Sequence, residues 1–210
     1  MQQGRRLLGV GALWLGAVGL LVARPGLAID FSADIVGDHT APTALHVADQ
    51  AVRIDAPTGY FLTKDGAALF VRPGKQMFTD ARKSTPLTQW FVPVDPDSPC
   101  AQWQAAAVNA GVAGSDGAWH CERIESAPRS RWRVTPPGQS SRECWIDPSL
   151  RFPVRIQMSD GTSLSLENIR PGAQSPELFT IPAGFRRLDP QSLIEHIKRS
   201  DVWVEPAASH

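Results

Sequence analysis

The sequence predicts a mainly β protein: a curved antiparallel sheet that forms an incomplete barrel, with a mid-chain helical insertion and a C-terminal helix. Three observations support this fold class. Apolar and polar residues alternate through the stretch 144–167, as they do in antiparallel strands with one buried face. Asp65-Gly66 and Ser159-Asp160-Gly161 are typical hairpin turns. Between residues 84 and 117 the alternation gives way to helical spacing.

Residues 1–28 have the pattern of a cleaved signal peptide. Arg5-Arg6 gives a positive start, residues 7–22 are apolar, and Gly26-Leu27-Ala28 places small residues where a signal peptidase cuts. The apolar run is short for a membrane span, so we expect no transmembrane segment in the mature chain. The sequence therefore predicts an exported, periplasmic protein. Arg5-Arg6 leaves both the general and the twin-arginine export routes open.

The mature chain, residues 29–210, has the length of one domain with one substantial core. The signal peptide contains three of the 21 basic residues and none of the 21 acidic ones, so the mature net charge is −3. A slightly acidic chain of this kind is not expected to bind nucleic acid.

The amino-terminal part predicts a meander of about five strands, because alternating segments are separated by short turns that force antiparallel neighbours. The stretch from His39 to Pro42 is interpreted as a loop. The predicted strands and hairpins cover residues 31–36, 44–56, 60–64, 67–72 and 76–79.

Two helices are predicted next, at 86–92 and 99–108, within the insertion 84–117. Apolar residues recur at helical spacing in the first, and Ser98-Pro99 is a typical helix start for the second. Strands then resume at 119–125, 131–135 and through the stretch 144–167, which gives about nine strands in all. Asp189-Pro190 begins the expected C-terminal helix.

Three cysteines suggest one disulfide, since an exported protein meets an oxidising compartment. Cys121 and Cys144 are predicted to flank a third strand, and two strand spacings put them about 9–10 Å apart, too far to bridge. Cys100 lies in a helix or loop that can fold back, so we expect a Cys100–Cys121 disulfide and a buried free Cys144. The alternative is that all three are small buried residues.

A sheet of this length must curl, and its apolar concave face then needs a cover. The two mid-chain helices would provide that cover, with Trp90, Phe91 and Trp103 pointing inward. Ile156 and Leu164 belong to the apolar faces of the opposing strands. These five residues are our candidates for lining a cavity that holds an apolar ligand. The alternative is that they form ordinary core, where aromatic residues are common.

The sequence predicts no catalytic residues, no metal site and no cofactor, so we do not expect an enzyme. No two of the five histidines have a spacing that suits a metal. A local basic cluster could meet lipid phosphate or an acidic partner, although a solvated strand face needs no function and is the interpretation that we favour. The cluster comprises Arg129, Arg131, Arg133 and Arg142.

The order of elements resembles the LolA/LolB-like superfamily of periplasmic lipoprotein carriers and outer-membrane lipoprotein-sorting proteins. The segments that carry the resemblance are FSADIV, VRID, FVRPGKQMF and WID…PVRIQMSDGTSLSLENI…LFTIPAGF. The resemblance implies an incomplete barrel with a helical lid over an apolar cavity that holds lipoprotein acyl chains. It also implies that Arg53 ties the barrel to its lid. The alternative function is that of a non-catalytic structural or interaction protein of the envelope, whose core is filled by its own side chains. Such a protein would bind an envelope protein partner.

Overall fold

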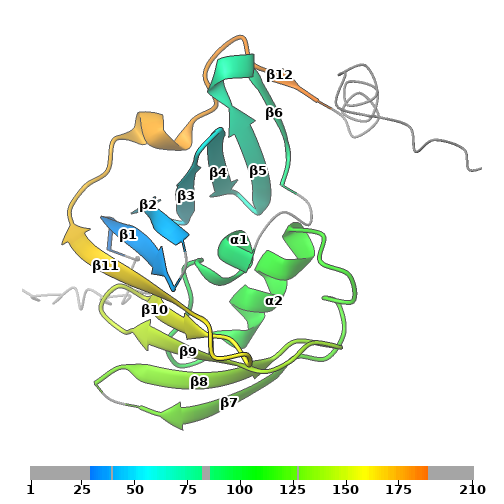
Figure 1. Cartoon of the computed structure of the whole chain (residues 1–210), viewed down its shortest axis with the longest axis vertical. Coiled ribbons are helices and arrows are strands. Elements are labelled where there is room, and N and C mark those ends of the chain that lie inside the picture. The colour runs from blue at the N-terminus through cyan, green and yellow to red at the C-terminus, as the bar shows by residue number, and fades with distance from the viewer. Residues whose placement is uncertain (1–28, 39, 82–85, 127, 189–210) are drawn as a thin grey trace, which may run out of the picture.

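The computed structural model describes residues 29–38, 40–81, 86–126 and 128–188, which form one curved sheet wrapped around two helices (Figure 1). The predicted signal peptide, the C-terminal helix and the tail beyond it lie outside the described residues. The sheet has twelve strands, more than the nine expected, in the order β12-β6-β5-β4-β3-β2-β1-β11-β10-β9-β8-β7, and it does not close into a barrel. The predicted fold class, mainly β with an incomplete barrel and a mid-chain helical insertion, is confirmed.

Two meanders make up the sheet, one from each half of the chain. The first contains β1 (Phe31–Gly37), β2 (Thr40–Ala48), β3 (Ala51–Ala56), β4 (Gly59–Lys64), β5 (Ala67–Arg72) and β6 (Met77–Asp80). The second contains β7 (His120–Glu125), β8 (Ser130–Thr135), β9 (Arg142–Asp147), β10 (Phe152–Gln157) and β11 (Ser163–Pro171). Short turns join neighbours within each meander, so these pairs are antiparallel.

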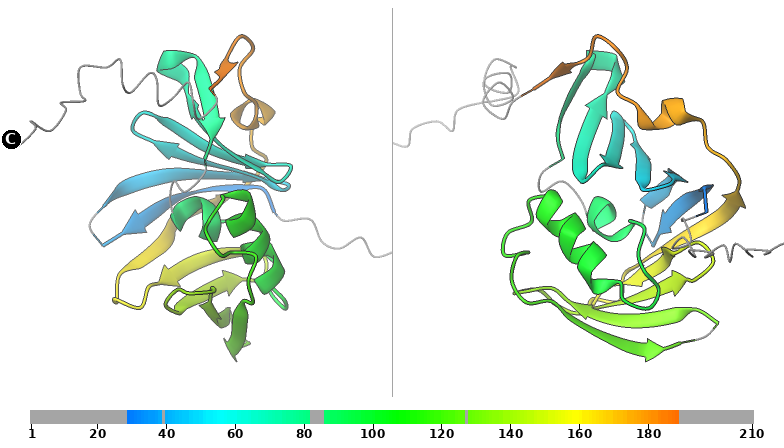
Figure 2. Two further views of the ribbon diagram at one scale, coloured as in Figure 1. Left: turned by 90° about the vertical axis from the view of Figure 1, so that its right-hand side faces the viewer. Right: turned by 180° about the vertical axis from the view of Figure 1, so that it is seen from behind.

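The two meanders meet where β1 pairs with β11, antiparallel, from Phe31 opposite Pro171 to Gly37 opposite Leu164. After β11 the chain crosses back over the first meander and forms β12 (Arg186–Arg187), which pairs parallel with β6. Figure 2 shows the resulting curl from two further sides, with the first meander above the helices and the second below them.

The prediction of a loop was wrong for residues 40–42, because β2 begins at Thr40 and includes Pro42. The pairing of β1 with β2 shifts register between Ile35 and Gly37, and Pro42 has no partner in that register. A proline lacks the N–H that a regular ladder needs, so an irregularity of this kind is where a strand tolerates one.

Helix α1 (Pro86–Trp90) is shorter than the predicted 86–92, whereas α2 (Cys100–Asn109) lies within one residue of the predicted range. Pro93 explains the early end of α1, because the residue before a proline is disfavoured in helical conformation. Phe91 still donates its backbone N–H to the carbonyl of Leu87 at 3.0 Å, so the last turn is completed just beyond the helix.

Apolar side chains are buried on both faces of the sheet. On the concave face, α1 and α2 pack against both meanders and form the main core. On the outer face of the first meander, the segment 174–188, which includes the 3₁₀ helix η2 (Pro176–Phe179), covers a second and smaller cluster. That cluster comprises Ala51, Tyr60, Leu62, Val71 and Phe179, with Leu178, Ile181 and Phe185 beside them.

Candidate functional site

The concave face brings the predicted lid aromatics together in the core. Trp90, Phe91 and Trp103 each have 0% of their surface exposed. The Trp90 ring lies 5.7 Å from the Trp103 ring and 6.0 Å from the Trp119 ring, measured between centroids. Phe91 stacks against Phe152 of β10 at 6.4 Å. These side chains therefore contact one another and the sheet as a packed aromatic layer.

Ile156 and Leu164, the predicted strand contributors, are direct neighbours across β10 and β11. Ile156 is fully buried in the main core, while Leu164 is partly buried and packs against that core. The structure thus brings all five predicted lining residues to one concave face.

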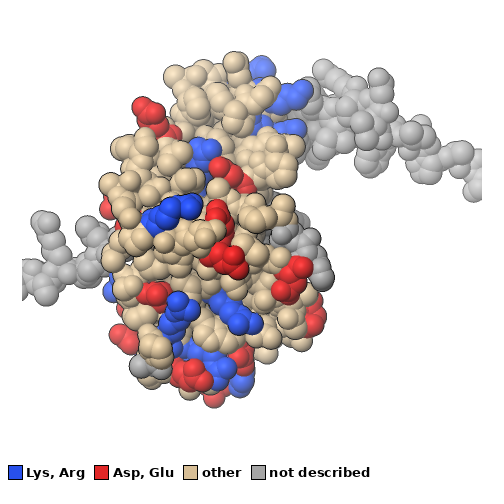
Figure 3. All heavy atoms as spheres, turned by 60° about the vertical axis from the view of Figure 1, so that its left-hand side comes forward, with Lys and Arg blue, Asp and Glu red and all other residues tan. Residues whose placement is uncertain are grey.

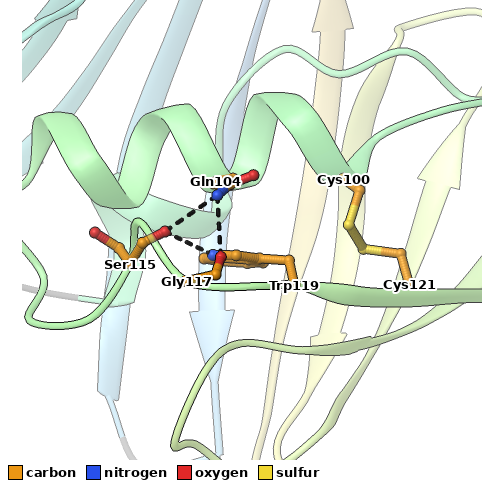
Figure 4. The surroundings of a disulfide bond; sticks show 6 residues. All are labelled: Cys100, Gln104, Ser115, Gly117, Trp119 and Cys121. Carbon is orange, nitrogen blue, oxygen red and sulfur yellow. Dashed lines mark hydrogen bonds between the residues drawn. A yellow bond between two sulfur atoms is a disulfide. The ribbon is translucent and has the colours of Figure 1, made fainter.

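Helix α2 is covalently attached to the sheet by the predicted disulfide between Cys100 and Cys121, which is confirmed (Figure 4). Hydrogen bonds also attach α2 to the loop before β7. The Gln104 amide donates to the backbone carbonyls of Ser115 and Gly117, and the Trp119 indole N–H also donates to the Ser115 carbonyl. Helix α2 is therefore held to β7 at its first residue and to the loop before β7 one turn later.

Cys144 is the buried free cysteine, as predicted. Strand β8 separates it from Cys121, since Val134 lies opposite Cys121 and Trp132 lies opposite Cys144. Burial raises the pKa of the Cys144 thiol far above its ordinary value, so the thiol stays protonated and is a poor nucleophile.

Arg142 is the one member of the predicted basic cluster that lies on the concave face, next to Cys144 on β9. Its guanidinium carbon is 4.8 Å from the centre of the Trp90 ring. The Nε donates to the Met158 sulfur at 3.3 Å, and one Nη donates to the Gln139 side chain at 3.0 Å. Burial lowers the pKa of this guanidinium below its ordinary value, which reflects the cost of holding a charge there.

The other arginines of the cluster lie on the outer face and are matched by acidic side chains. Arg131 contacts Glu125 and Glu143, and Arg133 contacts Glu122 and Glu143. On the side of the molecule shown in Figure 3, acidic and basic side chains are interspersed over the lower part. This face of the sheet thus has a balanced charge rather than a basic patch.

Arg53 does not contact α1 or α2. Its side chain points to the outer face of the first meander, where the guanidinium carbon lies 3.8 Å above the Tyr60 ring centre and Nε contacts Asp55 at 2.8 Å. One Nη donates to the Leu178 carbonyl at 3.4 Å. Arg53 therefore ties the sheet to the segment 174–188, which differs from the lid contact that the family resemblance implied.

Two of the surface clefts in the described part of the chain lie away from the concave face. One has a volume of about 420 Å³ and lies between the β2–β3 and β4–β5 turns and η2, with Asp49, Lys64 and Phe179 in its wall. The other, of about 640 Å³, lies at the tip of the second meander beside Trp145 and Asp147. Among the described residues, no group of three or more His, Cys, Asp or Glu side chains is placed to hold a metal ion.

Neither helix in the described part of the chain is long and apolar enough to span a membrane. The fold and the concave site together define the class as a mainly β protein whose unclosed sheet encloses two short helices, one of them disulfide-bonded.

No family model matches the chain, and no curated protein matches it. Among solved structures, the chain is similar to an uncharacterized conserved protein from Thermus thermophilus, with a TM-score of 0.42 and 10% identity over 77% of this chain and 91% of that one. It is also similar to the complex of Pseudomonas aeruginosa MucA and MucB, with a TM-score of 0.34 and 15% identity over 73% of this chain. The chain spans 56% of that second chain. Likenesses of this size define neither a family nor a function.

Sequence reasoning missed two features of the molecule. The first is the pairing of Arg142 with Trp90, which needs the packing of α1 against β9. The second is the cover of the outer face by the segment 174–188. Alternation did contain a signal for the placement of Arg53, because Val52 and Ile54 face the main core and the residue between them must point outward.

Proposed function

We propose that this protein is an exported, non-catalytic binding protein that holds or carries an apolar ligand, such as a lipid, an acyl chain or the acyl chains of a lipoprotein. The ligand lies between the concave face and the two helices. The order of elements that resembles the LolA/LolB-like superfamily supports this proposal, and the disulfide supports residence in an oxidising compartment such as the periplasm.

One observation carries the proposal. The sheet is unclosed, and among the described residues its apolar concave face is covered by one five-residue helix and one ten-residue helix. A ligand reaches that face by displacing α1, without breaking any strand pairing. Because α2 is covalently attached to β7, we assign the movement to α1, which opens the hydrogen bond from the Trp103 indole to the Trp90 carbonyl and closes again over the ligand.

A second candidate function is a structural or interaction protein of the envelope with a filled core. The observation that favours it is the complete burial of Trp90, Phe91 and Trp103, which fill the concave face without a ligand. A partner protein would then bind on the outside of the molecule.

The two functions differ in what the purified protein contains. We would record native mass spectra of protein prepared from the periplasm and extract its lipids. Carriage predicts a stoichiometric lipid or acyl species, or uptake of a fluorescent fatty acid on titration. A ligand-free mass together with no fatty-acid uptake would remove the carrier proposal and leave the interaction protein.

A matched pair of variants tests where the ligand lies. Phe91→Ala enlarges the space between the helices and Phe152 of β10, so fatty-acid uptake should rise severalfold if the ligand occupies that space. Val108→Ala changes an exposed side chain on α2 and should leave uptake unchanged. Equal uptake by both variants and the parent protein would place the ligand elsewhere.

A further inference from the structure

Five buried nitrogen donors of the described residues lack an acceptor, and two of them belong to side chains that contact each other on the concave face. One is an Nη of Arg142, and the other is the Nε1 of Trp90; neither has a hydrogen-bond partner among the described residues. Trp90 is fully buried, and the Arg142 guanidinium lies over its ring. Unpaired buried donors are rare in folded proteins and point to a group that completes them.

Arg142 also lacks a counter-ion. Within the described part of the chain it forms no ion pair, although Arg131 and Arg133 on the outer face share Glu143. Its own Nε donates to a thioether sulfur, which is a weak acceptor. The neighbouring Cys144 supplies no charge, because burial keeps its thiol neutral. A partly buried guanidinium without an anion is costly, and an incoming oxyanion would offset that cost.

Apart from the Gln139 side chain, which accepts a hydrogen bond from the other Nη of Arg142, the side chains that contact this guanidinium are apolar or aromatic. Met158 contacts the guanidinium, and Met158 and Leu164 are partly buried side chains that pack against the main core. Ile156 of β10 lies opposite Leu164 of β11 on one side and opposite Cys144 of β9 on the other. A ligand that satisfies the donors here must therefore also present apolar surface.

We propose that Arg142 and Trp90 bind the carboxylate or phosphate of an anionic amphiphile, whose apolar chain lies against Met158 and Leu164. The inference rests on the proposed function, since it assigns the head-group class of the ligand held at the concave face. The guanidinium supplies a charge-assisted hydrogen bond, and the indole N–H of the ring beneath it is the second unpaired donor.

The test compares ligands that share one chain and differ in head group. Oleate, oleoyl lysophosphatidic acid and oleyl alcohol are titrated into the whole protein by calorimetry below their micelle concentrations, and inorganic phosphate is titrated alone. We expect both anionic ligands to bind at least tenfold more tightly than oleyl alcohol. Equal affinities for oleate, oleoyl lysophosphatidic acid and oleyl alcohol would overturn the proposal.

Variants assign the effect to Arg142. Arg142→Gln should abolish the preference for anionic ligands, with affinity for oleyl alcohol retained, and Arg142→Lys should restore part of the preference. Arg129→Gln changes an exposed arginine of the same predicted cluster that contacts Asp147, so it is the matched control and should retain the full preference. A preference that survives in Arg142→Gln would overturn the assignment.

The ligand set separates this inference from the function on which it rests. Binding of oleyl alcohol with no preference for anions supports an apolar carrier and rejects the anion site. Binding of inorganic phosphate that Arg142→Gln abolishes, without binding of any chain, supports the anion site and rejects the carrier. Binding of none of the four probes rejects both.

Discussion

The indole N–H of Trp103 donates a hydrogen bond to the backbone carbonyl of Trp90 at 3.2 Å, and this bond joins α2 to the last residue of α1. Trp103 is the residue through which the disulfide-bonded helix positions the shorter one. The position of α1 over the sheet, and of the donors that α1 contributes, therefore depends on α2.

Replacing Trp103 with Phe removes this hydrogen bond and part of the buried ring. We expect the free energy of unfolding to fall by about 1–3 kcal/mol, from the lost bond and the cavity together. Urea denaturation of the parent protein and the variant measures this difference in the free energy of unfolding. Val108→Ala, at an exposed position of the same helix, should change stability by no more than about 0.5 kcal/mol. Equal effects of the two changes would contradict the role of Trp103.

The Cys100–Cys121 disulfide closes a loop between residues 21 positions apart, so it restricts the unfolded chain. The double variant Cys100→Ser and Cys121→Ser should be about 3 kcal/mol less stable than the oxidised parent. Denaturation of the parent with and without a reducing agent checks this, and the reduced parent should match the double variant. A parent whose transition is insensitive to reduction would refute it.

Cys144 makes stability depend on alkaline pH. Burial raises its pKa in the folded state, while the unfolded thiol ionises near pH 8.5, so the unfolded state loses a proton that the folded state keeps. The contribution of Cys144 is complete below about pH 8.5. Above it, the free energy of unfolding should fall by up to about 1.4 kcal/mol per pH unit.

The control for this pH effect is Cys144→Ala. Denaturation at several values between pH 7 and 9.5 should show a decline in the parent that is smaller in the variant. Identical slopes in the two proteins would show that another group is responsible.

Gly59 is required where β4 lies against β5. A Cβ at this position would collide with the backbone carbonyl oxygen of Val71, which cannot move without disturbing the strand. We expect Gly59→Ala to cost about 1–3 kcal/mol or more. Gly74→Ala places a Cβ where no atom lies within 4 Å, so its thermal transition should stay near that of the parent. A Gly59→Ala protein as stable as Gly74→Ala would disprove the close contact.

Much of the architecture was predictable because it depends on local patterns. Asp65-Gly66 and the alternation on either side of it define a hairpin without tertiary information, and Asp65 does adopt the left-handed conformation that such a turn needs. The disulfide followed from topology, since a strand between Cys121 and Cys144 excludes their pairing.

The site was less predictable, because it depends on contacts between distant segments. The residues near Arg142 in the sequence do not indicate that Trp90 lies against its guanidinium. They also do not indicate that the guanidinium lacks a carboxylate partner. Similarly, the segment 174–188 has no helical or strand period, and its role as a cover becomes visible only when Phe179 is seen against Tyr60 and Leu62. Periodicity predicts which side of an element is apolar and leaves open what lies against it.

The seam between the two meanders also sets an order of events during synthesis. Asp34 of β1 accepts a hydrogen bond from Asn168 of β11, 134 positions later. Strand β1 is among the first strands to be synthesised. Its edge that pairs with β11 stays unpaired until almost the whole described chain has been synthesised. Non-local pairing of this kind is slow and leaves the nascent chain prone to aggregation. The seam that holds the two meanders together therefore cannot form until β11 has been made, whatever pairing has taken place before it.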